Sequence, residues 1–286
     1  MVNRTSDRLF NALMYVTLLL VSIAAIFPML YVVSVSITPY TELLRNGGFI
    51  VIPRSVTFAA YRELFHQPYI LSAFNITVFI TVVGTAINLI LTTLMAFPLS
   101  RKDLPGRNIV LMMVVLTLLF SGGIIPTYLI VKDTGLLDSV WSMIIPNAIW
   151  SFNVLIMKSF FENLPEEIME SARMDGSSEY GLLIKIVVPL SVPVMFTLGL
   201  FYLVGHWNEF YHAIMYVTKP DIQPLQVVIR NMLMQAHSQV ESVDETIPTM
   251  TLQMAAVVYA SLPIIVFYPF IQKHFSKGII IGAIKG

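Results

Sequence analysis

The most informative polar segment of this chain is residues 162–189, which separates two long apolar runs. The segment contains no catalytic constellation, because the chain has no cysteine and its five histidines lack the spacing of metal ligands. The phosphate-binding pattern Gly-x-x-x-x-Gly-Lys-[Ser/Thr] is absent as well, so the chain has no ATP site of that kind. The chemistry that the segment can offer is therefore recognition by another protein.

The first half of the segment predicts a short helix. Asn163 or Leu164 can cap it, and Pro165 in its first turn is already fixed at a helical backbone angle. The helix should run to about Met174 and end at Asp175-Gly176, because glycine reaches the left-handed backbone conformation at little energetic expense.

The second half predicts another helix, which Ser177 or Ser178 can cap and which continues through Ile184 towards Pro189. The two helices would form a helix–turn–helix parallel to the membrane. Its expected apolar face consists of Ile168, Ala172 and Leu183, and its expected polar edge of Glu170, Arg173 and Asp175.

The rest of the chain is predicted to lie in a membrane. Hydrophobic residues make up 56% of the 286 residues and charged residues only 12%, where soluble domains carry about 25%. The mean hydropathy is +0.77. A spanning helix needs about 20 apolar residues. Six uncharged runs of at least 19 residues meet that length and predict six transmembrane helices in an all-α membrane protein: 9–41, 67–100, 108–131, 139–157, 186–208 and 246–272.

The first run could be mistaken for a secretory signal. Its apolar stretch extends beyond the roughly 7–15 residues of a signal core and lacks an evident cleavage site, so we expect a retained helix. With six spans both termini share one side. That side would hold 11 Lys and Arg residues against 6 on the other, which predicts cytoplasmic termini and a cytoplasmic 162–189 segment.

These spans suggest three regions. Residues 1–72 would form the first transmembrane helix and an external loop. Residues 73–274 would form a core of five helices that includes the 162–189 loop, and residues 275–286 would form a cytoplasmic tail.

The loop resembles that of permease subunits of bacterial ATP-binding-cassette (ABC) importers. In that family the pattern is Glu-Ala-Ala, three residues, Gly, nine residues, Ile-x-Leu-Pro. This chain has Glu170-Ser-Ala, then Gly176, then Ile186-x-Val-Pro189, with Ser171 and Val188 as the only departures. His206-Trp-Asn-Glu-Phe210 is similar to the Trp-Asn-Asp-Phe hallmark of sugar-importing members, and the tail from Phe275 resembles that of the maltose-type permease with six helices.

The resemblance implies a type I importer permease in the bacterial cytoplasmic membrane that is not an enzyme and binds no cofactor. ATP and Mg²⁺ would be bound by a partner ATPase. It also implies a second related permease, two nucleotide-binding subunits, an external solute-binding protein and a sugar or oligosaccharide substrate, without nucleic acid. The residues expected to dock on the ATPase are Glu170, Ser171, Ala172, Asp175, Gly176, Ile186 and Pro189.

A sugar path would need amide, hydroxyl and aromatic partners. Trp150 and Asn153 could provide them in the fourth run, and Trp207, Asn208 and Glu209 at the end of the fifth. A structural role remains open for each of them, since aromatic side chains also anchor helices at membrane interfaces.

Other functions remain as alternatives. The permease could import another small solute, such as a peptide or a glycerol phosphate. A gradient-driven carrier usually needs an ionisable residue near the middle of the membrane, and no Asp, Glu, Lys or Arg lies in the middle of the six runs. An intramembrane protease would need a motif such as His-Glu-x-x-His, which the chain lacks.

Overall fold

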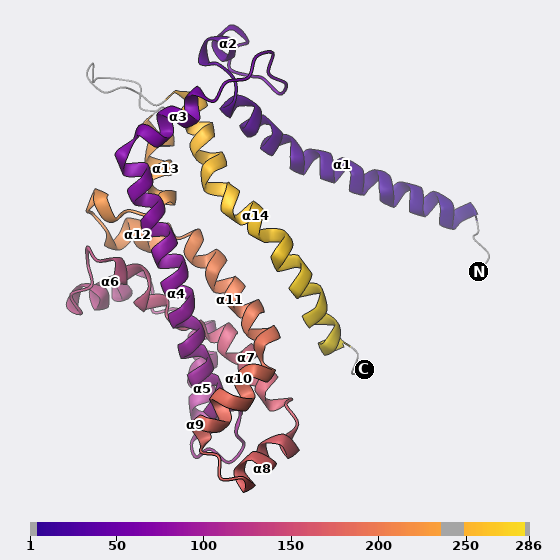
Figure 1. Cartoon of the computed structure of the whole chain (residues 1–286), viewed down its shortest axis with the longest axis vertical. Helices are drawn as coiled ribbons and strands as arrows, with labels where there is room; N and C mark the ends of the chain where they lie inside the picture. The colour runs from indigo at the N-terminus through magenta and orange to yellow at the C-terminus, as the bar shows by residue number, and fades with distance from the viewer. Residues whose placement is uncertain (1–4, 236–248, 284–286) are drawn as a thin grey trace. The chain divides into compact units, whose positions relative to one another are not determined.

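The computed structural model describes residues 5–235 and 249–283, and over these ranges all regular structure is helical (Figure 1). This agrees with the predicted all-α class, and it is the arrangement that pairs every backbone N–H within its own segment in a bilayer. In chain order the helices are α1 (Thr5–Ser36), α2 (Tyr40–Arg45), α3 (Ala59–His66), α4 (Pro68–Ser100), α5 (Arg107–Leu119), α6 (Ile124–Asp133), η1 (Val140–Met143), η2 (Ile145–Asn147), α7 (Ser151–Glu162), α8 (Glu166–Met174), α9 (Glu179–Leu182), η3 (Leu183–Val187), α10 (Val188–Leu190), α11 (Val192–Trp207), α12 (Tyr211–Tyr216), η4 (Pro220–Ile222), α13 (Leu225–Gln235) and α14 (Met250–Ala283).

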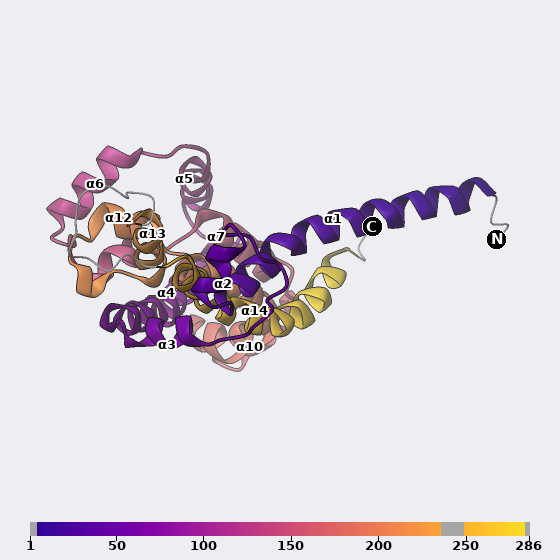
Figure 2. The ribbon, with the colours of Figure 1, turned by 90° about the horizontal axis from the view of Figure 1, so that it is seen from above.

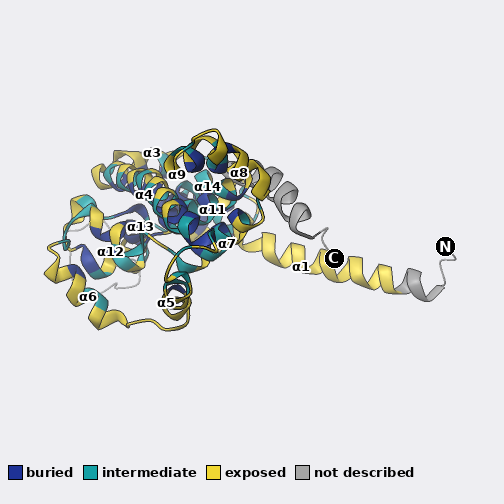
Figure 3. Cartoon of the chain, turned by 90° about the horizontal axis from the view of Figure 1, so that it is seen from below, coloured by how far each residue is buried: buried dark blue, intermediate teal, exposed yellow. Residues whose placement is uncertain are grey.

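The chain divides into two units: unit 1 comprises residues 1–70 and 229–263, and unit 2 comprises residues 71–228 and 264–286. In unit 1, α1 is exposed from Phe10 to Leu30, which Figure 3 shows in yellow. Its last turn joins a small core with Leu43 and Ile50, and Met250 and Met254 pack against that core. An apolar helix exposed over so much of its length is suited to a bilayer.

Unit 2 contains the larger core, and its buried residues lie among α4, α7, α9 and α11 (Figure 3, dark blue). One cluster joins these helices to α8 near the loop end of the unit. A second cluster, around Ile80, Met143, Ile144 and Ala213, lies at the end that carries η1 and α12. Helix α4 runs between both clusters and is the common support of the unit.

Several of the predicted spans are broken in the structure. Two described helical stretches, Phe10–Ser36 and Pro68–Ser100, are each long and apolar enough to cross a membrane unbroken. Three bent pairs raise that number to five if each pair is one span: Arg107–Leu119 with Ile124–Asp133, Val140–Asn147 with Ser151–Glu162, and Glu179–Leu190 with Val192–Trp207.

The sharpest bend, 115°, separates α5 from α6 inside the run that predicts a single span. Figure 2 shows the two helices joined by a non-helical connection. Gly122 and Gly123 occupy this connection, and Gly123 has φ +92°, a value outside the helical range. Hydropathy does not reveal such a break, because two glycines leave the run uncharged and apolar on average.

Two glycines in unit 2 allow large side chains to approach closely. A Cβ atom built on Gly84 would lie 2.5 Å from Nε2 of His206, and one on Gly205 would lie 2.5 Å from the ring of Trp150. Both contacts join α11 to another element, so each glycine sets how closely a neighbouring segment packs against it.

We expect Gly84→Ala to destabilise the protein by about 1–3 kcal/mol, because the buried His206 ring must move to admit the methyl group. Thermal unfolding of the detergent-solubilised chain measures the effect. Gly122→Ala is the matched control, since no atom lies within 4 Å of that position. Equal melting temperatures for the two variants would contradict the close packing.

Candidate functional site

The candidate site is the 162–189 loop, and its first helix is α8 (Glu166–Met174). The predicted helix is confirmed, with its start one or two residues later than expected, but the predicted cap is wrong. The N-cap residue is Pro165, with no side-chain hydrogen bond, and neither Asn163 nor Leu164 takes that place. Proline already has the required backbone angle and no N–H to satisfy, and the acids Glu166 and Glu167 complement the positive helix end.

The turn after α8 is set by Gly176, which has φ +82°. The Gly176 N–H donates to the Arg173 carbonyl at 3.0 Å, and the Ser177 N–H donates to the Ala172 carbonyl at 3.0 Å. This pair of bonds is the Schellman arrangement, which satisfies the last carbonyls of a helix and favours glycine at the left-handed position. The predicted break at Asp175-Gly176 is confirmed.

The second helix begins as predicted at one of the two candidate caps. The Ser178 hydroxyl accepts a hydrogen bond from the Gly181 N–H at 3.2 Å. Helix α9 then widens into the π-helical segment η3 before Pro189. Pro189 cannot donate a backbone hydrogen bond and its ring crowds the preceding turn, so a wider turn relieves the clash.

The loop presents a different apolar face from the predicted one. Ala172 and Leu183 are buried as expected, whereas Ile168 is 42% exposed and Met169 is buried in its place. Met169 and Ala172 are three residues apart and share one helix face, whereas Ile168 lies about 100° away from Met169 around the helix. The exposed side of the loop carries Met174, Tyr180 and Ile184.

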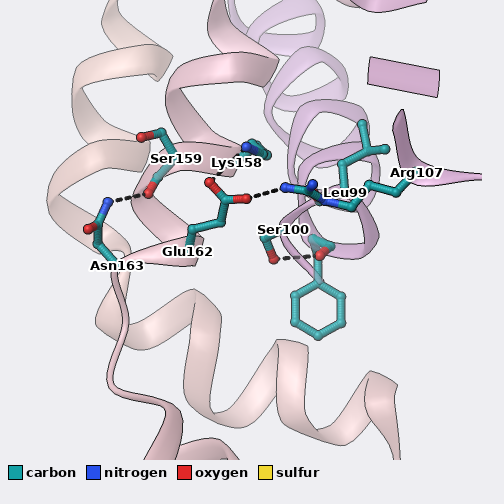
Figure 4. A network of polar contacts seen from close by, with 8 residues as sticks. Leu99, Ser100, Arg107, Lys158, Ser159, Glu162 and Asn163 are labelled. Atoms are coloured by element: carbon teal, nitrogen blue, oxygen red, sulfur yellow. Dashed lines mark hydrogen bonds and ion pairs between the residues drawn. The ribbon is translucent and has the colours of Figure 1, made fainter. Parts of the chain in front are cut away.

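A network of charges fixes the base of the loop (Figure 4). Glu162, at the end of α7, accepts hydrogen bonds from Arg107 and, at 2.7 Å, from Lys158. Arg107 Nε also donates to the Leu99 carbonyl at 2.8 Å. The ends of α4 and α7 and the start of α5 are thereby tied together directly beside the loop.

Within the loop one ion pair links its two helices. Arg173 Nε lies 2.9 Å from Oε1 of Glu179. This hydrogen bond raises the pKa of Arg173 above its ordinary value. Both side chains are partly exposed, and their contribution to stability is correspondingly small.

The aromatic and amide candidates all belong to unit 2, where Asn153 and Trp207 are buried, Trp150 is partly buried and Asn208 is exposed. Trp150 packs on Tyr202 with ring centroids 4.9 Å apart, and Trp207 packs edge-on against Phe74 at 6.0 Å. Asn153 is fully buried, and among the described residues neither atom of its amide group has a hydrogen-bond partner. The exposed Asn208 donates to the carbonyl of Val204, one turn back in its own helix.

The structure places Glu209, one of the predicted path residues, in a polar cluster with His212 and Asn147, which were not predicted. Glu209 accepts from the His212 backbone N–H at 3.0 Å and lies 3.1 Å from Nδ1 of the same residue. Asn147 lies within 3.0 Å of the His212 ring. The i, i+3 spacing of Glu209 and His212 was the signal in the sequence that could have predicted their contact.

With this geometry established, comparison with known proteins assigns the chain to a family. Residues 81–281 match the binding-protein-dependent transport system inner membrane component family. The chain belongs to this family. The permease is accordingly a non-catalytic membrane subunit, as the resemblance implied.

Two relatives from Bacillus subtilis (strain 168) match the permease over nearly its whole length. The polygalacturonan/rhamnogalacturonan transport system permease protein YtcP is 41% identical, covering 98% of this chain and 99% of the relative. Protein LplC is 42% identical, covering 100% and 98%.

A solved structure shares the fold. It is a chain from the crystal structure of a bacterial ABC transporter involved in the import of the acidic polysaccharide alginate. The TM-score is 0.89 at 28% identity, and the match covers 96% of the permease and 99% of that chain. The all-helical permease fold predicted from the sequence is confirmed at this level.

At the end of unit 2 that carries η1 and α12, Asp138 joins two connections of the permease. It accepts hydrogen bonds from the Thr218 N–H at 2.6 Å and the Lys219 N–H at 3.2 Å, and its own N–H donates to the Tyr216 carbonyl. The backbone hydrogen bond from Thr218 is the main reason that the pKa of Asp138 lies below its ordinary value.

Because the pKa of Asp138 is depressed in the folded state, its contribution to stability is present above about pH 4 and is lost as the pH falls further. We expect the melting temperatures of the wild-type chain and Asp138→Asn to differ at pH 6 and to converge as the pH is lowered below about 4. The asparagine variant serves as the internal control, since all other acids titrate in both proteins. A difference that is constant with pH would contradict the prediction.

Proposed function

We propose that the permease forms half of the translocation path for a sugar or oligosaccharide and couples to an ATPase subunit through the 162–189 loop. The exposed apolar side of that loop is the observation that carries the proposal. Met174 is 82% exposed and Tyr180 is 75% exposed, on either side of the Gly176 turn. Large apolar side chains on a polar loop outside the apolar runs favour a protein partner.

The exposure of the other predicted docking residues supports the same proposal. Met169 and Ala172 hold its inner face on unit 2, so Glu170, Ser171 and the Asp175-Gly176 turn are left on or near the outer face. Nothing lies within 4 Å of the position that a Gly176 side chain would occupy, which leaves room for a surface of the ATPase. Ile186 and Pro189 follow in the segment that returns the chain to α11.

The proposed topology has six spans with both termini and the loop in the cytoplasm. Helices α1 and α4 would each span alone, and the three bent pairs would supply three further spans. Helix α14 would be the sixth, since its 34 residues extend about 51 Å. In this scheme residues 1–72 form the first span and external loop, residues 73–274 the core, and residues 275–286 a cytoplasmic tail. Residues 284–286 lie outside the described residues.

The assembly would contain this permease, a second related permease and two nucleotide-binding subunits, with an external solute-binding protein that delivers the cargo. ATP and Mg²⁺ would be bound by the ATPase subunits, and their closure would move the loop. Membership of a binding-protein-dependent family supports the external binding protein, and the exposed apolar side chains of the loop support a protein partner at that surface.

The proposed cargo is an oligosaccharide derived from a polysaccharide. The relative named for polygalacturonan and rhamnogalacturonan and the alginate importer both support this class. Trp150 and Asn153 would line the path together with Trp207, Asn208 and Glu209. The buried and unpartnered amide of Asn153 supports a polar contact with the cargo, because an unsatisfied buried amide is unfavourable.

We expect Gly176→Trp to abolish co-purification of the ATPase with the permease, because the indole would occupy the space of the docked partner. Gly106→Trp is the matched control. Gly106 also has a left-handed backbone, φ +74° against +82°, and open space around it, so the two variants carry the same strain. Normal co-purification of Gly176→Trp, or equal loss in both variants, would contradict docking at this turn.

A pull-down of the tagged permease from its native membrane tests the assembly and the cargo together. We expect a second permease, an ATPase and a solute-binding protein that retains an oligosaccharide, which mass spectrometry would identify. A binding protein loaded with a peptide or a glycerol phosphate would favour the alternative cargo. Active transport in liposomes by this chain alone, without ATP, would refute the proposed function.

A further inference from the structure

Arg101 follows the last residue of α4 and lies against the inner face of α8. Its guanidinium carbon is 4.7 Å from the ring centroid of Phe97, and its Nη1 is 2.8 Å from the sulfur of Met169. A positive charge is therefore held between two apolar side chains, at the contact between a long helix and the proposed docking loop.

This guanidinium is poorly satisfied. Among the described residues, its Nε and Nη2 atoms are buried and have no hydrogen-bond partner, and Nη1 has only the weakly accepting thioether of Met169. Burial lowers the pKa of Arg101, and the charge of Arg173 lowers it further. Buried charges are normally paired, so this arrangement leaves donors available for a carboxylate.

The charges on α8 flank the point of contact. Met169 faces Arg101, Glu166 lies three residues before Met169, and Arg173 lies four residues after it. These spacings place all three side chains on one side of the helix. Both Glu166 and Arg173 are close enough to influence Arg101 electrostatically, with opposite signs.

We propose that Arg101 is a positioning residue that responds to the axial position of α8, forming an ion pair with Glu166 when the helix moves about one turn. A shift of α8 along its N-to-C direction by three residues, about 4.5 Å, would replace Met169 by Glu166 opposite the guanidinium. A shift the other way would bring Arg173 opposite it and is opposed by repulsion. One-turn shifts of packed helices are an established form of switching between two states.

Movement of α8 relative to Arg101 would break the core contacts of Met169 and the Arg173–Glu179 pair, so binding of the ATPase would have to offset their loss. Non-helical residues bound the helix on both sides, at 163–165 and 175–178. The end of α4 is tied to α5 and α7 through Arg107 and Glu162. This inference rests on the proposed function, because docking of the ATPase on the loop is the event that would move α8.

The test is a double-mutant cycle in the reconstituted importer, with the number of substrate molecules transported per ATP hydrolysed as the measurement. The variants are Arg101→Met, Glu166→Gln and their combination. Methionine suits the apolar contacts of Phe97 and Met169, so we expect the fold to survive. Glu167→Gln is the matched control, since it removes the same charge one position along α8 from a residue that is also exposed.

We expect each single variant to lower the coupling ratio about tenfold and the double variant to lower it no further, because both changes remove one ion pair. Arg101→Lys should restore most of the ratio, since an ammonium group can also pair with Glu166. The Glu167→Gln variant should match the wild type.

Two outcomes would overturn the proposal. One is a Glu166→Gln variant with the same coupling ratio as Glu167→Gln. The other is a double variant whose loss of coupling ratio equals the product of the losses in Arg101→Met and Glu166→Gln, since independent effects combine in that way. A purely structural role for Arg101 would change the melting temperature while leaving the coupling ratio intact. Failure of the unaltered permease to co-purify with an ATPase would refute the proposed function itself, which is a separate result.

Discussion

The structure of unit 2 depends on one continuous apolar core that extends from the long helices into the polar loop. Ala96 of α4, Met157 of α7 and Leu198 of α11 belong to the same cluster as Met169 of α8 and Leu182 of α9. The loop is thus packed on the helical core like any other part of it. Because close-packed interiors transmit displacement and do not absorb it, a force applied to the outer face of α8 reaches α4, α7 and α11 through this core.

Polar interactions determine how the loop is held at its edges. Glu162 and Arg107 fix its base, Ser178 and the Gly176 turn fix its internal geometry, and the Arg173–Glu179 pair links its two helices. Each is local in sequence or lies at a helix end, where backbone groups need partners. The loop therefore has two distinct faces. Apolar packing on the core determines the inner face, and Met174 and Tyr180 are exposed on the outer face.

The sequence predicted the helical class, the α8 helix and the Gly176 turn because these features depend on local rules: apolar run length, the helix preference of residues 166–174 and the left-handed backbone that glycine allows. It did not predict the 115° bend between α5 and α6, since Gly122 and Gly123 leave the hydropathy of the run high. The sequence also predicted Ile168 on the buried face of α8, where the structure has Met169. The buried face of so short a helix is decided by the core it contacts, and the position of that core is not visible in the sequence of the loop.

The polar residues in the interior of unit 2 were harder still to interpret, and the reason is physical. An apolar run shows where a helix lies but not which of its faces meets a neighbour, so Asn88, Thr92 and Asn153 look equivalent in sequence. In the structure Asn88 donates to the Asn147 carbonyl, Thr92 pairs with Tyr202, and Asn153 has no described partner. The hydrogen bonds of Asn88 and Thr92 join α4 to other segments, whereas the amide of Asn153 makes no hydrogen bond to a described residue. This difference in partners arises from tertiary contacts such as the close approach of Gly205 and Trp150, which the sequence does not show.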